Sequence, residues 1–146
     1  MDLSDVKAEA ARLGVWVHLA TVSPSGTPYV SPVHPAWEGD TLWTMFGTDS
    51  VKAKNVAVNP KVTCHWQVSD QTGFDSLIVW GHGQAHDDVE TKRRLWDGVF
   101  DYDLGEFAPD GPDDAPGIGF LAITPRRAVL LRQYGMGGRD VWRAGE

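Results

Sequence analysis

Short runs in which apolar and polar residues alternate, each closed by a turn signal, constrain the fold of this chain most. Three of them are VWVHLATV (15–22), TLWTMF (41–46) and KVTCHWQV (61–68), all rich in β-branched and aromatic residues. A period of two places successive side chains on opposite faces of a strand. The sequence therefore predicts a mainly β protein.

The extended run TPYVSPVHPAW (27–37) lies between the first two of these strands. Its three prolines exclude a helix and suit edge or irregular strand positions, because proline has no N–H to donate to a ladder. Turn residues at SPSG (23–26) and EGD (38–40) flank the run. We therefore expect residues 15–46 to form an antiparallel meander of three strands.

The second half of the chain predicts further strands. DSLIVWGHGQAHD (75–87) contains Gly81 and Gly83, which inside a strand indicate a bulge or a sharp bend. GFLAITP (119–125) and RRAVLLRQY (126–134) are expected to be the last two strands, followed by a short tail. Six or seven antiparallel strands favour a small closed or partly open barrel, which removes exposed strand edges.

Three short helices are expected beside the strands. The first spans 3–13 with Ser4 or Asp5 as its cap, the second spans 49–60 with Asp49 or Ser50, and the third spans 87–104 with Asp87 or Asp88. The third is amphipathic, and we expect its charged residues to form a solvated face. The Pro, Gly and Asp residues of 105–117 predict a loop.

Composition limits the function classes. The chain has 146 residues, the size of one domain spanning 1–146, and a net charge of −7, which argues against nucleic-acid binding. No apolar run approaches the roughly 20 residues of a membrane span, and no signal-peptide pattern is present, so we expect a cytoplasmic protein with no membrane partner. The single cysteine, Cys64, is expected in the core, and we predict no metal site.

The segment GTDSVKAKN (47–55) places Ser50, Lys52 and Lys54 near the start of a helix. Cations there oppose the helix dipole, whereas N–H groups, a hydroxyl and an ammonium together favour a bound anion. The spacing has the outline of a phosphate site, although it lacks the G-K-[ST] ending of a P-loop, and on the spacing alone a surface helix with two solvated lysines is the simpler interpretation.

The order of motifs resembles a known family. A-T-V-x-x-x-G-x-P-x-x-x-P-V, then D-x-L-W, then S-x-K-x-x-N and N-P-x-V, spread between residues 15 and 87, resemble the pyridoxamine 5'-phosphate oxidase-like split-barrel flavoproteins. The resemblance implies a six-stranded antiparallel split barrel that forms a homodimer and binds FMN at the subunit interface.

The resemblance also implies roles for individual residues. Ser50 and Lys52 would hold the flavin phosphate, and Ser76 would lie near the ring or the phosphate. The ring edge would be lined by Val30, Ser31, Pro32 and Val33. Backbone groups for the ring would come from Thr44, Met45 and Phe46.

The implied activity is a flavin-dependent oxidoreductase acting on an unidentified small molecule. Val51 stands where oxidases of pyridoxamine phosphate have Arg, and Tyr29 and His34 stand near positions where they have Arg and Lys. We therefore do not expect that particular reaction. His34, Trp37, Trp66 and Tyr134 are candidates for substrate contact, and Arg139 and Trp142 for contact with the partner's flavin.

Two alternatives remain at this point. One is a reductase that uses the deazaflavin F420 on the same fold. Its acidic tail would favour more cations around the groove, such as Lys61, Arg126 and Arg127. The other is a flavin- or haem-binding protein without turnover, for which His82 and His86 are the relevant residues, although ordinary strand histidines are the simpler interpretation.

Overall fold

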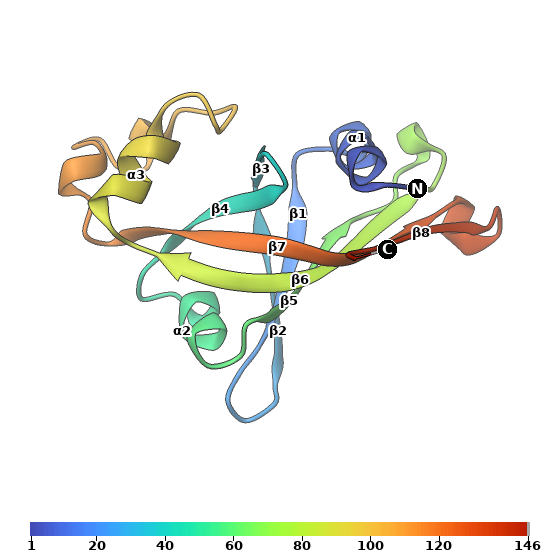
Figure 1. Ribbon diagram of the computed structural model, residues 1–146, viewed down its shortest axis with the longest axis horizontal. Coiled ribbons are helices and arrows are strands. Elements are labelled where there is room, and N and C mark those ends of the chain that lie inside the picture. Colours follow the sequence, from blue (N-terminus) through green and yellow to red (C-terminus); the bar gives the residue numbers. More distant parts are fainter. Residues whose placement is uncertain (146) are drawn as a thin grey trace.

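The computed structural model describes residues 1–145, and it confirms a mainly β fold with three flanking α-helices (Figure 1). The sheet has eight strands, more than the six or seven expected. The elements are α1 (Leu3–Leu13), β1 (Val17–Val22), β2 (Pro28–Val33), β3 (Ala36–Glu38), β4 (Thr41–Gly47), α2 (Val51–Val58), β5 (Lys61–Trp66), β6 (Ser76–His86), α3 (Val89–Trp96), β7 (Ile118–Leu131) and β8 (Arg139–Arg143).

The long strands β6 and β7 form the centre of the sheet (Figure 1). The hydrogen-bonded order is β2-β1-β5-β6-β7-β4-β3, and β8 pairs with β7 as well. The first half of β7 has β4 on its free edge, and the second half has β8. Because β2 and β3, the ends of this order, do not pair within residues 1–145, the barrel is split rather than closed.

A bulge at Gly81 bends the central strand pair. Trp80 pairs with Arg127 and Gly81 with Pro125, so one extra residue of β7 lies opposite this point. A Cβ on Gly81 would stand 2.6 Å from the Thr124 carbonyl oxygen, so only glycine fits there. The predicted bulge is confirmed. The prediction of two separate strands at 119–134 is wrong, because Pro125, which has no N–H, lies beside the extra residue Arg126 of the bulge, and β7 continues through both.

The predicted meander of three strands is wrong. The run 27–37 divides at His34–Pro35 into β2 and β3, and these pair with different neighbours. β1 and β2 form one hairpin and β3 and β4 another, while β4 pairs with β7 from the far end of the chain. Turn signals specify local hairpins, but they carry no information about which distant strand completes the ladder.

The end of the third helix, the tail and the cap of the first helix also differ from expectation. The third helix ends at Trp96 instead of 104, because Gly98 adopts a φ of 87°. The tail forms β8 on β7. α1 is capped by Asp2, which accepts from the Asp5 N–H, rather than by Ser4 or Asp5. None of the helices in residues 1–145 is long and apolar enough to span a bilayer.

The charged face of α3 is not wholly solvated. Lys92 is buried and donates from Nζ to the Ala115 carbonyl oxygen at 2.7 Å. The hydrogen bond fastens the 105–117 segment to α3, and Leu104 packs with Leu95 and Phe120 in a second, smaller core. A lysine on an amphipathic helix usually extends its ammonium into water, so the sequence pattern alone did not indicate this contact.

The main core lies between α1, α2 and the inner face of the sheet. It contains Leu19, Leu77, Val79, Leu121 and Leu130, all nearly inaccessible to solvent. Cys64 is also in this cluster, as predicted, and burial raises the pKa of its thiol to about 12. A thiol that stays protonated at neutral pH is a core residue and not a nucleophile.

We predict that Gly81→Ala destabilises the protein, because the new methyl group would collide with backbone that cannot move without breaking the β6–β7 ladder. Overpacking of this kind costs about 1–3 kcal/mol. Chemical denaturation measures the change. Gly117→Ala is the matched control, since a Cβ there meets nothing within 4 Å, and equal stabilities of the two variants would contradict the role given to Gly81.

Candidate functional site

The start of α2 leaves hydrogen-bond donors available. Ser50 caps the helix, and its Oγ accepts from the Ala53 N–H at 3.3 Å. The N–H groups of Val51 and Lys52 donate to no protein acceptor in residues 1–145. Free N–H groups at the start of a helix attract anions, because the helix dipole is positive there.

A buried hydrogen bond fixes α2 on the sheet. Asn55 Nδ2 donates to Thr21 Oγ1 of β1 at 3.0 Å, and both side chains are buried. On the same helix Val56 packs over Gly83 of β6, where an added Cβ would lie 3.3 Å from the valine Cγ1. These two contacts place the first turn of α2 beside the β1–β2 hairpin.

A groove of about 230 Å³ opens between the first turn of α2 and this hairpin. Lys52 reaches across it, and its Nζ lies 3.4 Å from Ser31 Oγ. The groove is lined by Thr21, Tyr29, Val30, Ser31, Ser50, Val51 and Lys52. The two hydroxyls, the ammonium and the free N–H groups converge on a single small space.

Lys52 has no carboxylate partner in the described chain. Its side chain is half-buried, and the loss of solvent lowers the pKa of its ammonium. None of the salt bridges within residues 1–145 includes it. A partly desolvated cation whose recorded partner is a neutral hydroxyl is the arrangement expected of an anion site.

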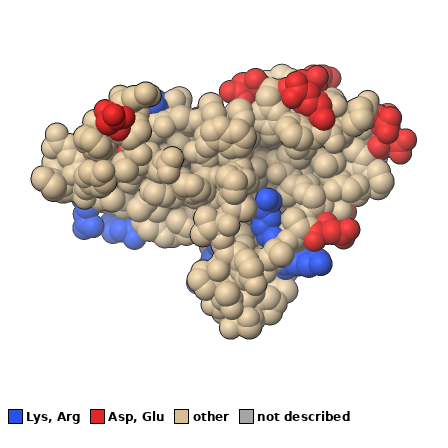
Figure 2. All heavy atoms as spheres, turned by 180° about the vertical axis from the view of Figure 1, so that it is seen from behind, with Lys and Arg blue, Asp and Glu red and all other residues tan. Residues whose placement is uncertain are grey.

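The other cations of this region face different hollows. Lys54 is exposed and lines a hollow of about 380 Å³ together with Phe46 and Asp87. Lys61 and Arg126 line a groove of about 400 Å³ on the other side of the sheet. Figure 2 shows that on one face most acidic side chains stand along the upper rim and most Lys and Arg side chains along the lower side.

The predicted ring-binding segments have free backbone edges. β3 pairs with β4 only at residues 41–43, so Thr44, Met45 and Phe46 have β7 on one edge and no strand on the other. β2, with Val30, Ser31, Pro32 and Val33, is the edge strand of the whole sheet. Val33 of β2 and Phe46 of β4 both contribute to the main core.

Ser76 does not join the other predicted site residues. It is buried at the first position of β6, opposite Leu131. α2 contacts β6 at Gly83, and at about 3.3 Å per residue Ser76 lies about 23 Å along the strand from that point. Ser76 and the groove are therefore far apart.

Thr21 and Val51 are groove residues that sequence reasoning missed. Thr21 is buried and serves both as acceptor for Asn55 and as part of the groove wall. Its inward direction follows from the alternation of β1, since Leu19 and Thr21 share a face. The alternation of β1 thus indicated that Thr21 points inward, but nothing in the sequence indicated that α2 would cover this face of the strand.

The proposed substrate contacts divide into two groups. His34, Trp37 and Trp66 line one cavity near α1. Tyr134 lies elsewhere and stacks on Phe74, with ring centroids 5.4 Å apart. At the C-terminal strand, Arg139 is exposed, while Trp142 packs against the main core.

The histidines do not form a metal cluster. Within residues 1–145 no group of three His, Cys, Asp or Glu side chains is arranged to hold a metal ion. His82 is exposed on the outer side of β6, and His86 packs against Trp43 with ring centroids 5.4 Å apart. Their neighbours on the sheet are those of ordinary strand residues.

Solved structures with the same fold include three informative relatives. A protein related to general stress protein 26, of the pyridoxinephosphate oxidase family, from Clostridium acetobutylicum has 20% identity and a TM-score of 0.76, covering 99% of this chain and 97% of its own. A pyridoxamine 5'-phosphate oxidase-related, FMN binding protein from Nostoc punctiforme has 18% identity and a TM-score of 0.66, covering 96% of this chain and 85% of its own. An F420 reductase has 27% identity and a TM-score of 0.58, covering 78% of this chain and 88% of its own.

At the two lower identities the likeness shows the fold alone. A comparison with curated protein sequences finds no significant match. The sequence profile of pyridoxamine 5'-phosphate oxidase, however, matches residues 15–131, from just before β1 to the end of β7. Because the match covers most of the chain and the whole groove, the protein belongs to the pyridoxamine 5'-phosphate oxidase family.

Proposed function

We propose that the protein is an FMN-dependent oxidoreductase that works as a homodimer. The observation that carries the proposal is the half-buried ammonium of Lys52, which faces a groove without a protein carboxylate. Burial of an unpaired cation is unfavourable in the free protein, and a bound dianion offsets that cost. The cofactor phosphate is the natural occupant of such a groove.

The residues present fit a phosphate group. Lys52 supplies charge, the Ser31 and Ser50 hydroxyls supply hydrogen bonds, and the N–H groups of Val51 and Lys52 point out of the helix start. FMN would supply the redox chemistry. The chain would bind the phosphate, orient the ring between the free edges of β2 and β4, and exclude water.

The β1–β2 hairpin supports a second copy as the partner. Residues 23–33 carry no charged side chain, and β2 exposes 45% of Tyr29 and 65% of Val30 at the edge of the sheet. The hairpin projects from the body of the molecule in Figure 1. An uncharged, apolar projection beside a cofactor groove is the surface that a homodimer would cover.

Three further sequence-based predictions do not support the proposed function. Ser76 is a buried strand residue far from the groove, so we leave it out of the proposed site. The contact of Arg139 and Trp142 with a partner's cofactor stays a prediction. The cytoplasmic location also stays a prediction.

The F420 reductase with 27% identity makes F420 the second candidate cofactor. The distribution of charge supports FMN instead. Among residues 1–145, Lys52 is the one cation that lines the groove, while Lys54 and Lys61 face separate hollows. The acidic tail of F420 would benefit from several cations along one path, and the hollow beside Lys54 also contains Asp87.

An absorbance spectrum of the purified protein, with mass analysis of what heat denaturation releases, tests the proposal. Released FMN supports it. A colourless protein that binds added F420 and not FMN would establish the second candidate. A colourless protein that binds neither would overturn the account of Ser50 and Lys52, and a protein that retains haem would favour binding without turnover.

We predict that Lys52→Ala weakens FMN binding by about 1.5–3 kcal/mol, the scale of a hydrogen bond to a charged group. The variant loses the ammonium that faces the phosphate, and fluorescence titration of flavin measures the change. Lys54→Ala is the matched control, two positions along the same helix but facing another hollow. Equal losses in both variants would show a general charge effect and not a phosphate contact.

We also predict that Lys52→Met stabilises the cofactor-free protein. Burial lowers the pKa of Lys52, so between its folded and unfolded pKa values the unfolded chain binds more protons. The penalty for burying the charged form is therefore full below the folded pKa of Lys52, and it is lost as the pH rises from the folded pKa to the unfolded pKa.

Thermal unfolding of the two cofactor-free proteins at several pH values tests this. The variant should melt higher at neutral pH, and the difference should narrow as the pH rises. Lys54→Met, at an exposed position, should show no such narrowing. A difference that stays constant with pH would contradict the burial penalty.

A further inference from the structure

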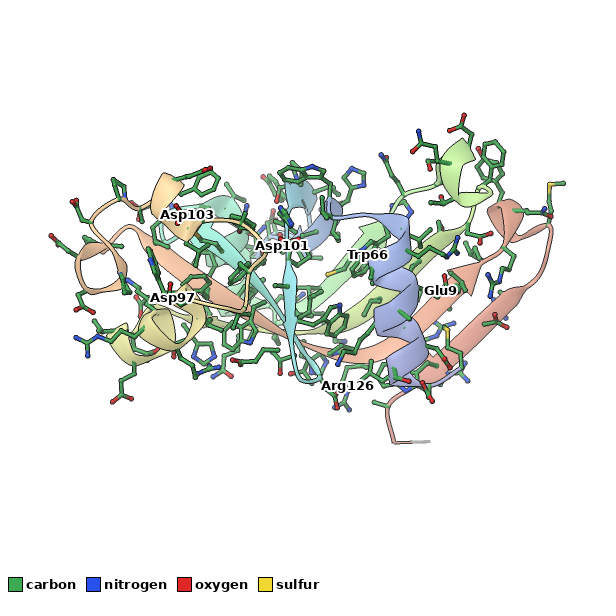
Figure 3. The ribbon with its side chains drawn as sticks, turned by 90° about the horizontal axis from the view of Figure 1, so that it is seen from above. Glu9, Trp66, Asp97, Asp101, Asp103 and Arg126 are labelled. Carbon is green, nitrogen blue, oxygen red and sulfur yellow. The ribbon has the colours of Figure 1, made fainter. Side chains whose placement is uncertain are left out.

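A second cavity, of about 320 Å³, lies away from the groove, between α1 and the connection from β2 to β3. Its walls include His34, Trp37, Leu42, Trp66, Val99 and Asp101. Figure 3 shows Trp66 next to α1, and Asp101 on the segment after α3 where that segment reaches farthest toward the middle of the molecule. Cavities that bind small molecules start at about this size.

The walls are apolar and rigidly held. Leu42 and Trp66 belong to the main core, with 1% and 2% of their surfaces exposed, and Trp37 packs against the same cluster. Lys7 stands over the Trp37 ring at 5.7 Å, but its Nζ donates to the Gly39 carbonyl oxygen at 2.6 Å. Trp37, which is partly exposed, therefore offers the indole face that suits a flat apolar ring, and the buried Leu42 and Trp66 form the apolar floor beside it.

The polar groups of the cavity come from one pair of residues. His34 Nε2 lies 2.7 Å from Asp101 Oδ1, an ion-pair contact without hydrogen-bond alignment, and Nε2 is buried with no hydrogen-bond partner in the described chain. The imidazole is held between the rings of Trp16 and Tyr102, at centroid distances of 5.4 Å and 4.6 Å. The side chain of Asp101 is 67% exposed, so its carboxylate can still accept hydrogen bonds from a ligand.

The charge of the cavity is negative. In the described part of the chain, Asp101 is the acidic residue that lines the cavity, and no Lys or Arg is among the lining residues. Burial raises the pKa of the neighbouring Tyr102, and the charge of Asp101 raises it further. A ligand with a phosphate or carboxylate would meet repulsion here, whereas a protonated nitrogen would meet a carboxylate.

We propose that this cavity binds a small aromatic molecule that carries a protonated nitrogen. The ring lies against Trp37, above the apolar floor of Leu42 and Trp66, and the ammonium or ring N–H donates to Asp101, whose carboxylate lies beside His34. His34 follows Ser31 by about 10 Å along the extended chain, so the cavity and the groove are two ends of one segment. Binding of this molecule does not depend on the proposed function. Its role as the redox substrate would rest on the proposed function.

The test uses the cofactor-free protein and three probes of nearly equal shape: benzylamine, benzyl alcohol and benzoate. Calorimetric titration at pH 7.5 gives their affinities. Benzylamine should bind about tenfold more tightly than benzyl alcohol, the effect of one charge-assisted hydrogen bond, and benzoate should bind most weakly. Absence of benzylamine binding at millimolar concentration, or benzoate binding as tightly as benzylamine, would overturn the proposal.

Two pairs of variants locate the binding. Asp101→Asn should remove the tenfold preference for benzylamine, and Asp97→Asn, on the same segment outside the cavity, should retain it (Figure 3). Ala11→Phe, which fills the cavity from α1, should abolish binding of all three probes, while Ala8→Phe on the same helix should not. An unchanged preference in Asp101→Asn would overturn the assignment.

FMN titration of Asp101→Asn separates this proposal from the previous one. If the cavity is independent of the groove, the variant binds FMN as the wild type does, and the Lys52 variants bind benzylamine as the wild type does. If the three probes do not bind while FMN binds normally, only the assignment of a ligand to the cavity is overturned. If FMN does not bind while the probes bind normally, only the assignment of the groove to the FMN phosphate is overturned.

Discussion

The buried hydrogen bond between Asn55 and Thr21 fixes the part of the molecule on which its proposed activity depends. It joins the middle of α2 to β1, and the packing of Val56 over Gly83 fixes the same helix on β6. An unpaired buried amide is costly, so the helix has one favourable position on the sheet. In that position the first turn of α2, with Ser50 and Lys52, faces Ser31 on the edge strand.

Lys52 shows how a binding site differs from the rest of a fold. Most charged side chains here are exposed or paired, as in the cluster of Arg12, Asp75 and Arg132. Lys52 is neither, and burial lowers its pKa. A residue that destabilises the free protein is tolerated where a bound ligand offsets the free-energy cost. Functional residues therefore often depart from the rule that buried charges are paired.

From the sequence, the residues of the groove could be predicted better than the pairing of the strands. The spacing of Ser50 and Lys52 at a helix start and the prolines that suit an edge strand at residues 27–37 are local features, and local features are what motifs and periodicity report. The pairing of β4 with β7, the single long β7 and the contact of Lys92 with Ala115 all join segments far apart in the chain. No pattern within a short window specifies such contacts. The end of α3 was signalled by Asp97–Gly98, but the apolar spacing of Val99 and Phe100 outweighed that signal, and those residues pack in the second core instead.

The comparison of FMN with riboflavin tests the central claim most directly, because the two differ only in the phosphate. Fluorescence titration of the wild type and of Lys52→Ala gives four affinities. The account predicts that the wild type binds FMN at least about tenfold more tightly than riboflavin, and that this preference is largely lost in the variant. Equal affinity for the two flavins in the wild type, or an unchanged preference in Lys52→Ala, would contradict the assignment of the groove to a phosphate.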